Sequence, residues 1–194
     1  MKDKIVKIFE DSIEVKKKFV EGHVDTIIEV ANVIAGAFNK GKKVLLFGNG
    51  GSATDASHLA AEFINRFQKE RPSLPAIALN TDMAVITAIA NDYDFSEIFS
   101  KQLKSLSDEG DVAIGISTSG SSANILKAMD VAKRKKLITI AFTGLKGDKF
   151  AAKAHYAFIV PSDKTARIQE THITLGHVLC RMVEEILFEA PRKK

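Results

Sequence analysis

Residues 44–63 have the sequence VLLFGNGGSATDASHLAAEF, and the pattern of this stretch indicates the class of fold. The four apolar residues from Val44 to Phe47 are typical of a strand that is buried on both faces of a sheet. A glycine-rich turn follows them and leads into a segment whose apolar residues recur at helical spacing. A buried strand, a tight turn and a helix together form the repeating unit of a parallel sheet, because parallel neighbours need a crossover connection.

The same pattern recurs along the rest of the chain. Short apolar runs, each separated from the next by an amphipathic stretch, lie at residues 76–79, 112–116, 138–142 and 157–160. With the run at 44–47 they make five candidate strands. Strands that alternate with helices predict a parallel sheet that is covered by helices on both faces.

Helices are also expected at both ends of the chain. Apolar residues from Ile5 to Phe38 recur at helical spacing with a break near Glu21-Gly22, which predicts an N-terminal helical hairpin. A last helix is expected from about Thr165 to Phe188. The predicted fold class is therefore α/β: a five-stranded parallel sheet flanked by helices on both faces, preceded by a helical hairpin.

Length and composition restrict the class of protein. A chain of 194 residues has the size of one domain, so we expect residues 1–194 to form a single domain. Its hydrophobic share of 45% and charged share of 27% are those of a globular protein, which argues against a disordered chain and a coiled-coil rod. The net charge of +4 comes from short basic runs that suit helix surfaces, so nucleic-acid binding is not predicted.

The sequence also predicts a cellular location. No apolar run approaches the roughly 18–20 residues that cross a bilayer, and the charged first residues lack the apolar segment of a signal peptide. The one cysteine, Cys180, permits no intrachain disulfide and is expected to be a small core residue. We therefore predict a cytoplasmic protein without a membrane partner.

Two loops that follow strands are candidate ligand sites, because ligands of such sheets bind beyond the carboxyl ends of the strands. Residues 48–52 (GNGGS) let the backbone turn sharply before a helix, and residues 117–124 (STSGSSAN) place hydroxyl groups at a helix N-terminus. Glycine and serine are also common in plain turns and caps. Two such loops at corresponding places favour a phosphorylated small ligand, whose phosphate is predicted to bind Ser117, Thr118, Ser119 and Ser122.

Neither loop has the pattern of a nucleotide site. The first lacks the lysine of a Walker motif, and GNGGS does not match the dinucleotide pattern GxGxxG, so ATP and NAD are not expected ligands. Asn91 and Asp92 follow an apolar helical pattern and suit sugar hydroxyls, although as a turn signal they are weak.

Proton chemistry or metal binding is suggested by two helices. His58 and Glu62 are spaced i, i+4 and share a helix face, a spacing that is also common for ordinary surface pairs. The last helix adds Gln169, His172 and His177, and a lone histidine on an apolar helix is more often a core residue. Gln169 and His177 lie about 12 Å apart along an ideal helix, so they meet at one centre only across a kink at Gly176 or from different subunits.

Three segments carry a family resemblance. GNGGSATDASHLAAE (48–62), GISTSGSSANILKA (115–128) and RIQETHITLGH (167–177) together resemble the SIS (sugar isomerase) domain proteins. The resemblance is strongest to the bacterial phosphoheptose isomerases, which convert sedoheptulose 7-phosphate to glycero-manno-heptose 7-phosphate, and it spans nearly the whole chain. It implies the SIS fold and a product that feeds heptose synthesis for lipopolysaccharide or another surface glycan.

The resemblance also implies roles for individual residues. Glu62 corresponds to the catalytic base and metal ligand of the family, and His177 to the proton-donating partner. A zinc ion would be held by His58, Glu62, Gln169 and His177. Substrate contacts are implied for Asn49, Gly50, Gly51, Ser52, Glu62, Asn91, Asp92, Ser117, Thr118, Ser119, Ser122 and Gln169. Family members are homotetramers with active sites at subunit contacts, and we expect helices within about residues 1–40 to serve oligomerisation.

Some positions depart from the family pattern and leave alternatives open. Many heptose isomerases have a histidine, an acid and an aspartate where this chain has Ala53, Ala61 and Ala166. Residues 66–82 and 162–170 look more like a second SIS branch, whose members associate with the bacterial replication initiator and are not known as isomerases.

The presence of Glu62 and His177 distinguishes the isomerases from the branch that associates with the replication initiator. The second branch lacks both groups, whereas this chain retains them, so the isomerase is the predicted function. The alternative is a non-catalytic SIS tetramer that binds the replication initiator. A third hypothesis is an SIS enzyme that acts on hexose phosphates.

Overall fold

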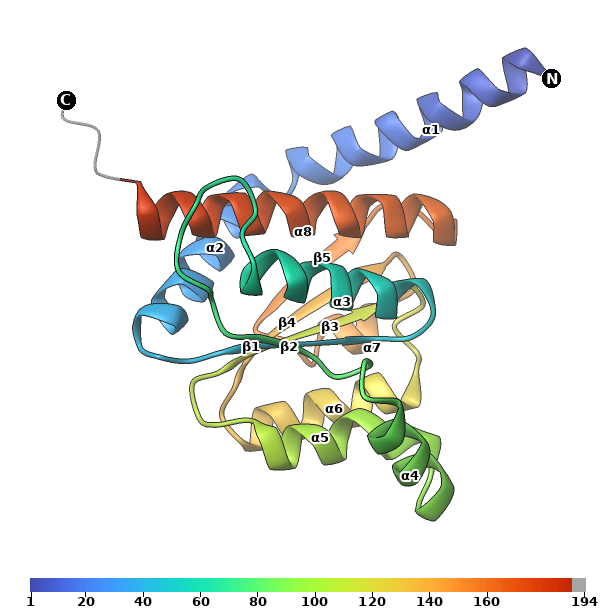
Figure 1. The fold of residues 1–194 in the computed structure, drawn as a ribbon. Coiled ribbons are helices and arrows are strands. Elements are labelled where there is room, and N and C mark those ends of the chain that lie inside the picture. Colours follow the sequence, from blue (N-terminus) through green and yellow to red (C-terminus); the bar gives the residue numbers. More distant parts are fainter. Residues whose placement is uncertain (190–194) are drawn as a thin grey trace.

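A five-stranded parallel sheet forms the centre of the protein (Figure 1). The computed structural model describes residues 1–189, so the last five residues of the predicted domain lie outside the described residues. In chain order the strands are β1 (Val44–Gly48), β2 (Ala76–Ala78), β3 (Val112–Ser117), β4 (Ile138–Gly144) and β5 (Tyr156–Val160). They lie side by side in the order β2-β1-β3-β4-β5, and each pair of neighbours is parallel. The predicted sheet is confirmed.

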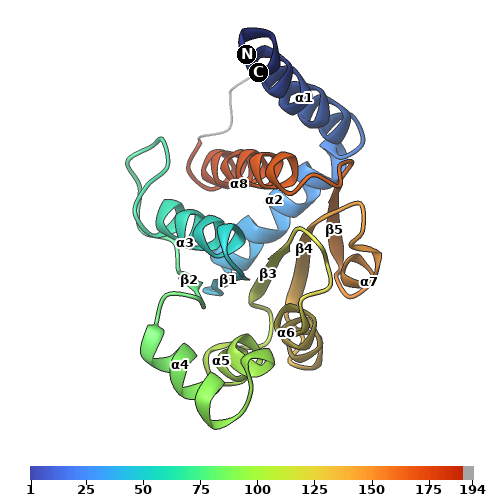
Figure 2. The same cartoon turned by 90° about the vertical axis from the view of Figure 1, so that its right-hand side faces the viewer.

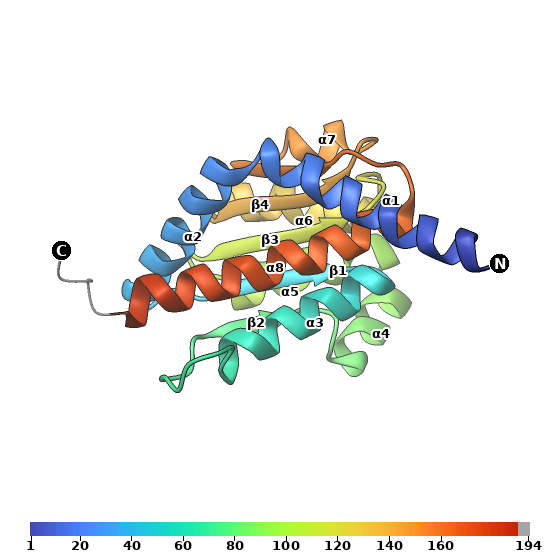
Figure 3. The same cartoon turned by 90° about the horizontal axis from the view of Figure 1, so that it is seen from above.

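Helices cover both faces of this sheet (Figure 2). One face carries α2 (Val24–Asn39), α3 (Gly51–Ile64) and α8 (Thr165–Phe188), with α1 (Lys2–Glu21) beyond them. The other face carries α4 (Met83–Asp92), the 3₁₀ turn η1 (Phe95–Glu97), α5 (Ile98–Leu106) and α6 (Ala123–Arg134), while the short α7 (Asp148–Ala151) packs against β4 and β5. Viewed from above, α8 lies between α3 and the pair α1 and α2 (Figure 3). The last helix has the predicted bounds.

Two apolar cores hold the layers together because consecutive strand residues point to opposite faces. Leu46 of β1 lies in the core under α2, α3 and α8, whereas Leu45 and Phe47 lie in the core that α5, α6 and α7 cover. All five residues of β1 are buried. The continuous apolar run in this strand therefore indicates a strand that helices cover on both sides.

The two N-terminal helices are present, but they do not pack as a hairpin. From the turn at Gly22 and His23, α2 continues away from α1 instead of folding back along it (Figures 1 and 3). Phe19 is the buried residue of α1. Ile5, Phe9 and Ile13 lie one helical turn apart and are all more than half exposed, so this apolar stripe is uncovered in a single chain.

The register of the sheet places the two predicted ligand loops at the same edge. Gly48 at the end of β1 lies beside Ile116 near the end of β3. Asn49 therefore leaves the sheet next to Ser117, the last residue of β3. Among the described residues, no helix is both long and apolar enough to span a membrane.

Candidate active site

Close packing of α3 against α8 creates the first part of the site. The two helices lie side by side (Figure 3). A Cβ atom on Gly176 would lie 2.5 Å from Leu59 Cδ2, so glycine at this position lets α8 approach α3 closely. The helix α8 is continuous through Gly176, and the kink considered from the sequence does not occur.

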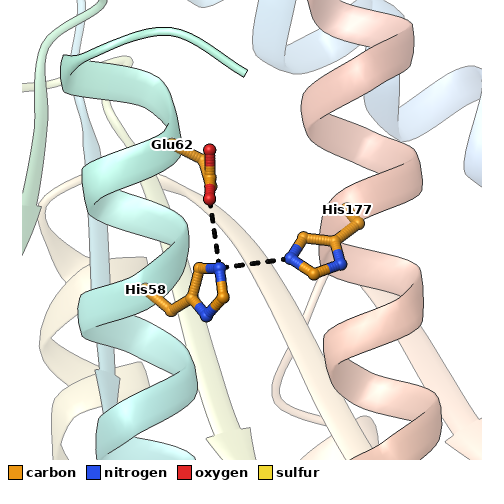
Figure 4. Close-up of side chains that lie close together, drawn as sticks. All are labelled: His58, Glu62 and His177. Atoms are coloured by element: carbon orange, nitrogen blue, oxygen red, sulfur yellow. Dashed lines mark hydrogen bonds and ion pairs between the residues drawn. The ribbon is translucent and has the colours of Figure 1, made fainter. Parts of the chain in front are cut away.

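His58, Glu62 and His177 form one cluster between these helices (Figure 4). Nε2 of His58 lies 3.1 Å from Oε1 of Glu62 and 3.3 Å from Nε2 of His177. One ligand atom of each residue lies within 4.8 Å of the other two. Two imidazole nitrogens and a carboxylate oxygen at this spacing can hold a divalent cation or act as an acid and a base.

The cluster is open to solvent on one side and covered on another. The side chain of His58 is 49% exposed and that of Glu62 is 24% exposed, so a small ligand can reach both. Phe67, from the segment after α3, stacks on the ring of His177 with the ring centres 5.6 Å apart. This stacking restricts the orientation of the imidazole plane.

Asp55 adds a carboxyl group that the sequence analysis missed. Its one signal is the spacing i, i+3 to His58. Burial raises the pKa of Asp55 to about 6, although the neighbouring charge of His58 acts to lower it. One carboxyl oxygen of Asp55 is buried without a hydrogen-bond partner. The N-terminal half of α3 thus holds a titratable group next to the cluster.

Gln169 lies apart from the cluster. A Cβ atom on Gly51 would lie 2.3 Å from Nε2 of Gln169, so the amide packs against the first turn of α3. Since α8 is continuous, Gln169 and His177 remain about 12 Å apart along its axis. Within one chain, the structure brings together three of the four predicted metal ligands.

The hydroxyl-rich loop after β3 forms the second part of the site. Thr118 and Ser119 line a cavity of about 200 Å³, together with Lys146 and Thr165. Gly120 has a φ of +64°, and a Cβ atom there would lie 2.4 Å from Cα of Gly147, so the turn requires glycine.

The hydroxyls of this loop have different partners. Ser117 is buried, and its Oγ accepts a hydrogen bond from the Gly120 N–H. Ser122 precedes α6 and makes no side-chain cap bond. The Ser119 hydroxyl accepts a hydrogen bond from the Ser121 N–H, so both Ser117 and Ser119 support the turn.

Asn49 connects the two loops. Its amide exchanges two hydrogen bonds of 2.9 Å with the amide of Asn124, which is 2% exposed. Asn49 and Ser122 both line a hollow of about 370 Å³. Asn124 has no predicted role, although it is the last residue of the hydroxyl-rich segment 117–124.

Comparison with known proteins fits this arrangement. The model of the SIS domain family matches residues 8–144. A curated phosphoheptose isomerase of Thermodesulfovibrio yellowstonii is 63% identical over 194 residues, covering 100% of this chain and 96% of that protein. The chain belongs to the phosphoheptose isomerase family of SIS-domain proteins.

Two further comparisons extend the match within this family. A phosphoheptose isomerase of Aquifex aeolicus is 57% identical over 189 residues, covering 97% of this chain and 99% of that protein. The solved structure of a phosphoheptose isomerase from Francisella tularensis superposes with a TM-score of 0.90 at 40% identity, covering 94% of this chain and 97% of that one. The family predicted from the three sequence segments is confirmed, and with it the α/β SIS fold.

The remaining predicted substrate contacts of this phosphoheptose isomerase chain differ in their exposure and in their position in the fold. Asn91 and Asp92 are exposed at the end of α4, on the other face of the sheet from α3 and α8, and hydrogen-bond to each other. Gly50 has a φ of +56°, which favours glycine in the turn before α3, and Ser52 is buried in the first turn of that helix.

Cys180 is buried as predicted, and of the two histidines of α8 it is His172 that lies in the core. His172 is 1% exposed and its Nε2 lies 3.3 Å from the Thr143 carbonyl oxygen. Burial lowers the pKa of His172 to about 4, with the hydrogen bond to Thr143 acting in the opposite direction. Burial raises the pKa of the Cys180 thiol to about 12. Neither side chain belongs to the cluster of His58, Glu62 and His177.

Proposed function

We propose that this chain is an aldose–ketose isomerase that converts sedoheptulose 7-phosphate to D-glycero-D-manno-heptose 7-phosphate in the cytoplasm. The observation that carries the proposal is the convergence of Glu62 and His177, which are 115 residues apart in the sequence, on one solvent-accessible cluster. The names of the relatives support the substrate, since the curated proteins at 63% and 57% identity are phosphoheptose isomerases.

The reaction moves one proton between neighbouring carbons and another between their oxygens. In the proposed mechanism the Glu62 carboxylate removes a proton from the carbon next to the carbonyl while His177 donates a proton to the carbonyl oxygen, which gives a cis-enediol. Glu62 then returns the proton to the neighbouring carbon. The imidazole of His177 moves the proton between the two oxygens. His58, hydrogen-bonded to Glu62 at 3.1 Å, holds the carboxylate in place.

The loop after β3 is proposed to hold the phosphate of the sugar. Thr118, Ser119 and Ser122 offer hydroxyls there, and Ser117 supports the turn through its bond from Gly120 N–H. The N-terminus of α6 adds backbone N–H groups and the positive end of the helix dipole. Binding energy from this remote phosphate fixes the reacting carbons against the base.

A zinc ion fits the cluster by the chemistry of its donor atoms. Two histidines and a glutamate are the protein ligands of many catalytic zinc sites, which keep a further position for water or substrate. Ligand atoms of a tetrahedral zinc ion lie about 3.3 Å apart, and the two Nε2 atoms of His58 and His177 are separated by 3.3 Å. We propose that His58, Glu62 and His177 hold the ion. When bound, zinc would polarise the oxygens of the substrate.

Self-association is part of the proposal. The stripe formed by Ile5, Phe9 and Ile13 on α1 is uncovered in one chain, and a second copy of the same helix suits such a surface. The predicted zinc ligand Gln169 lies about 12 Å from His177 along α8, so it can complete the cluster of a neighbouring subunit but not its own. We propose a homotetramer of one-domain chains, with the helices of residues 1–40 at its contacts.

An isomerase assay tests the proposal against its alternatives. Purified protein is incubated with sedoheptulose 7-phosphate, and the formation of an aldose phosphate is followed. Fructose 6-phosphate serves as the comparison substrate. We expect turnover of the heptose phosphate at a kcat/KM well above that for the hexose phosphate. A protein that acts only as a scaffold for the replication initiator would give no turnover of either sugar.

A further inference from the structure

A segment without helix or strand crosses the C-terminal half of α8. This segment, residues 65–75, connects α3 to β2, and we call it the strap. Part of its backbone is held by Glu184 of α8, a buried residue. Glu184 accepts hydrogen bonds from the N–H groups of Phe67 at 3.2 Å, Gln68 at 3.0 Å and Lys69 at 3.1 Å.

Arg71 completes this buried network. Its Nε donates to Glu184 at 2.9 Å, and both side chains are 2% exposed. Burial acts to raise the pKa of Glu184, but the hydrogen bonds from the strap and Arg71 outweigh burial and lower it. The carboxylate is therefore ionised and fully used by its four donors.

The other nitrogens of Arg71 bind the last turn of α3. Nη2 donates to the carbonyl oxygen of Glu62 at 2.8 Å, and Nη1 donates to that of Phe63 at 2.9 Å. Carbonyls in the last turn of a helix have no partner within the helix, so the guanidinium group caps α3 at the residue that carries the proposed base. A planar group with several fixed donors can make these bonds together, whereas an ammonium group cannot.

The same network reaches the partner histidine. Glu184 lies seven residues after His177, on the same face of α8 two turns further on. Phe67, whose N–H binds Glu184, stacks on the His177 ring. The pair of Arg71 and Glu184 thus connects the backbone under Glu62 to the surroundings of His177.

We propose that Arg71 and Glu184 are positioning residues, which keep the Glu62 carboxylate and the His177 imidazole in the relative placement that proton transfer requires. This inference rests on the proposed function of Glu62 and His177. Neither positioning residue touches the substrate. Their contribution therefore falls on the chemical step and not on the binding of the phosphate, which the loop after β3 holds.

Two conservative variants test the inference. Arg71→Lys keeps the positive charge beside Glu184 but loses the joint bonds to the carbonyls of Glu62 and Phe63. Glu184→Gln keeps the size of the side chain but replaces one acceptor oxygen with a donor. We expect kcat to fall about 10-fold to 100-fold in each, because displacements of about 1 Å cost this much. KM for sedoheptulose 7-phosphate should stay within about threefold.

The chain offers a matched control on the same helix. Arg181 and Glu185 form an exposed ion pair of 2.8 Å on α8, next to Glu184 in the sequence. Arg181→Lys and Glu185→Gln make the same chemical changes away from the strap and should leave kcat within about twofold. Thermal unfolding and native mass of every variant establish that the assayed protein is folded and assembled.

The outcomes separate a positioning role from a structural one. Folded Arg71→Lys and Glu184→Gln proteins with kcat within about twofold of the wild type would overturn the inference, as would a rise in KM at constant kcat. Should both variants fail to fold, Phe67→Leu is assayed in their place, because it removes the stacking on His177 and leaves the buried pair of Arg71 and Glu184 intact. The inference requires a lower kcat for Phe67→Leu. An unchanged kcat for this variant overturns the inference.

Glu62→Gln, assayed in parallel, distinguishes the inference from the proposed function. If Glu62→Gln keeps its rate, the proposed function fails. If Glu62→Gln loses its rate while Arg71→Lys and Glu184→Gln keep theirs, only the positioning role fails.

Discussion

Asn49 and Asn124 exchange two hydrogen bonds across the carboxyl ends of β1 and β3, each side-chain amide donating to the carbonyl oxygen of the other at 2.9 Å. The strands β1 and β3 are neighbours in the sheet, although β2 and the helices α3, α4 and α5 lie between them in the chain. The amide pair therefore fixes the glycine-rich loop relative to the hydroxyl-rich loop. In open α/β sheets this edge is where ligands bind.

Loss of this amide pair should weaken substrate binding. Asn124→Ala removes both hydrogen bonds to Asn49 and a third bond, from the N–H of Ile125. We expect a stability loss of about 1–3 kcal/mol and a rise in KM of about 10-fold, with kcat changed less, because the loops are proposed to bind the remote phosphate. Steady-state kinetics and chemical unfolding measure both effects. Asn32→Ala, on an exposed face of α2, is the control. An unchanged KM in Asn124→Ala would contradict the coupling of the two loops.

Most of the fold follows from local patterns in the sequence. Apolar runs predict all five strands because each strand is buried on both faces, and α8 spans the predicted residues Thr165–Phe188. The course of α1 could not be predicted, since its apolar stripe indicates a covered face without indicating what covers it. Helical spacing likewise does not tell which turn of α8 faces which turn of α3.

In the candidate site, contacts between residues close in the sequence could be predicted, whereas contacts between distant residues could not. The pair His58 and Glu62 could be predicted because the spacing i, i+4 places both on one face. The contact of Arg71 with Glu184 joins residues 113 positions apart, and no local pattern marks it. Asn124 lies within a quoted motif, but its partner Asn49 lies in another loop, so its role depends on the order of the strands.

Buried His172 should make the protein sensitive to acid. Its pKa is lowered to about 4 in the folded chain, so between pH 6.5 and 4 the unfolded chain binds a proton that the folded chain does not. Stability from the neutral imidazole is complete above pH 6.5 and is lost as pH falls. The free-energy difference between wild type and His172→Leu should shrink by about 2 kcal/mol from pH 7.5 to pH 5.

Chemical unfolding at the two pH values measures this change. His23→Gln, a substitution at the turn between α1 and α2, is the control. A difference between wild type and His172→Leu that stays constant with pH would show that His172 titrates as in the unfolded chain.

Zinc binding can be measured without reference to activity. Protein prepared without chelators should contain about one zinc ion per chain by elemental analysis, since the donors are arranged as in a catalytic site. His58→Ala and His177→Ala should each lose most of the ion. His155→Ala, which alters a histidine bonded to Thr139 just before β5, should retain it. Equal zinc content in all three variants would place the ion elsewhere.

The apolar stripe on α1 should hold the subunits together. Phe9 is 68% exposed in one chain, and Phe9→Glu places a charge at the centre of the stripe. We expect native mass measurements to show a tetramer for the wild type and smaller species for Phe9→Glu, with lower activity because Gln169 is proposed to act across a subunit contact. Lys4→Glu, on the same exposed helix, is the control for a change of charge. An unchanged mass for Phe9→Glu would exclude this stripe as the contact.

The role of Glu62 as the base is tested most directly by the rate of Glu62→Gln with sedoheptulose 7-phosphate. The reaction is run in D₂O, so that uptake of deuterium at the carbon of the new aldose is followed by NMR. The substitution keeps the size of the side chain, but an amide cannot accept the carbon proton. We expect turnover and deuterium uptake both to fall by at least about 10³-fold while KM changes little. A Glu62→Gln enzyme that exchanges and isomerises at nearly the wild-type rate would contradict this role.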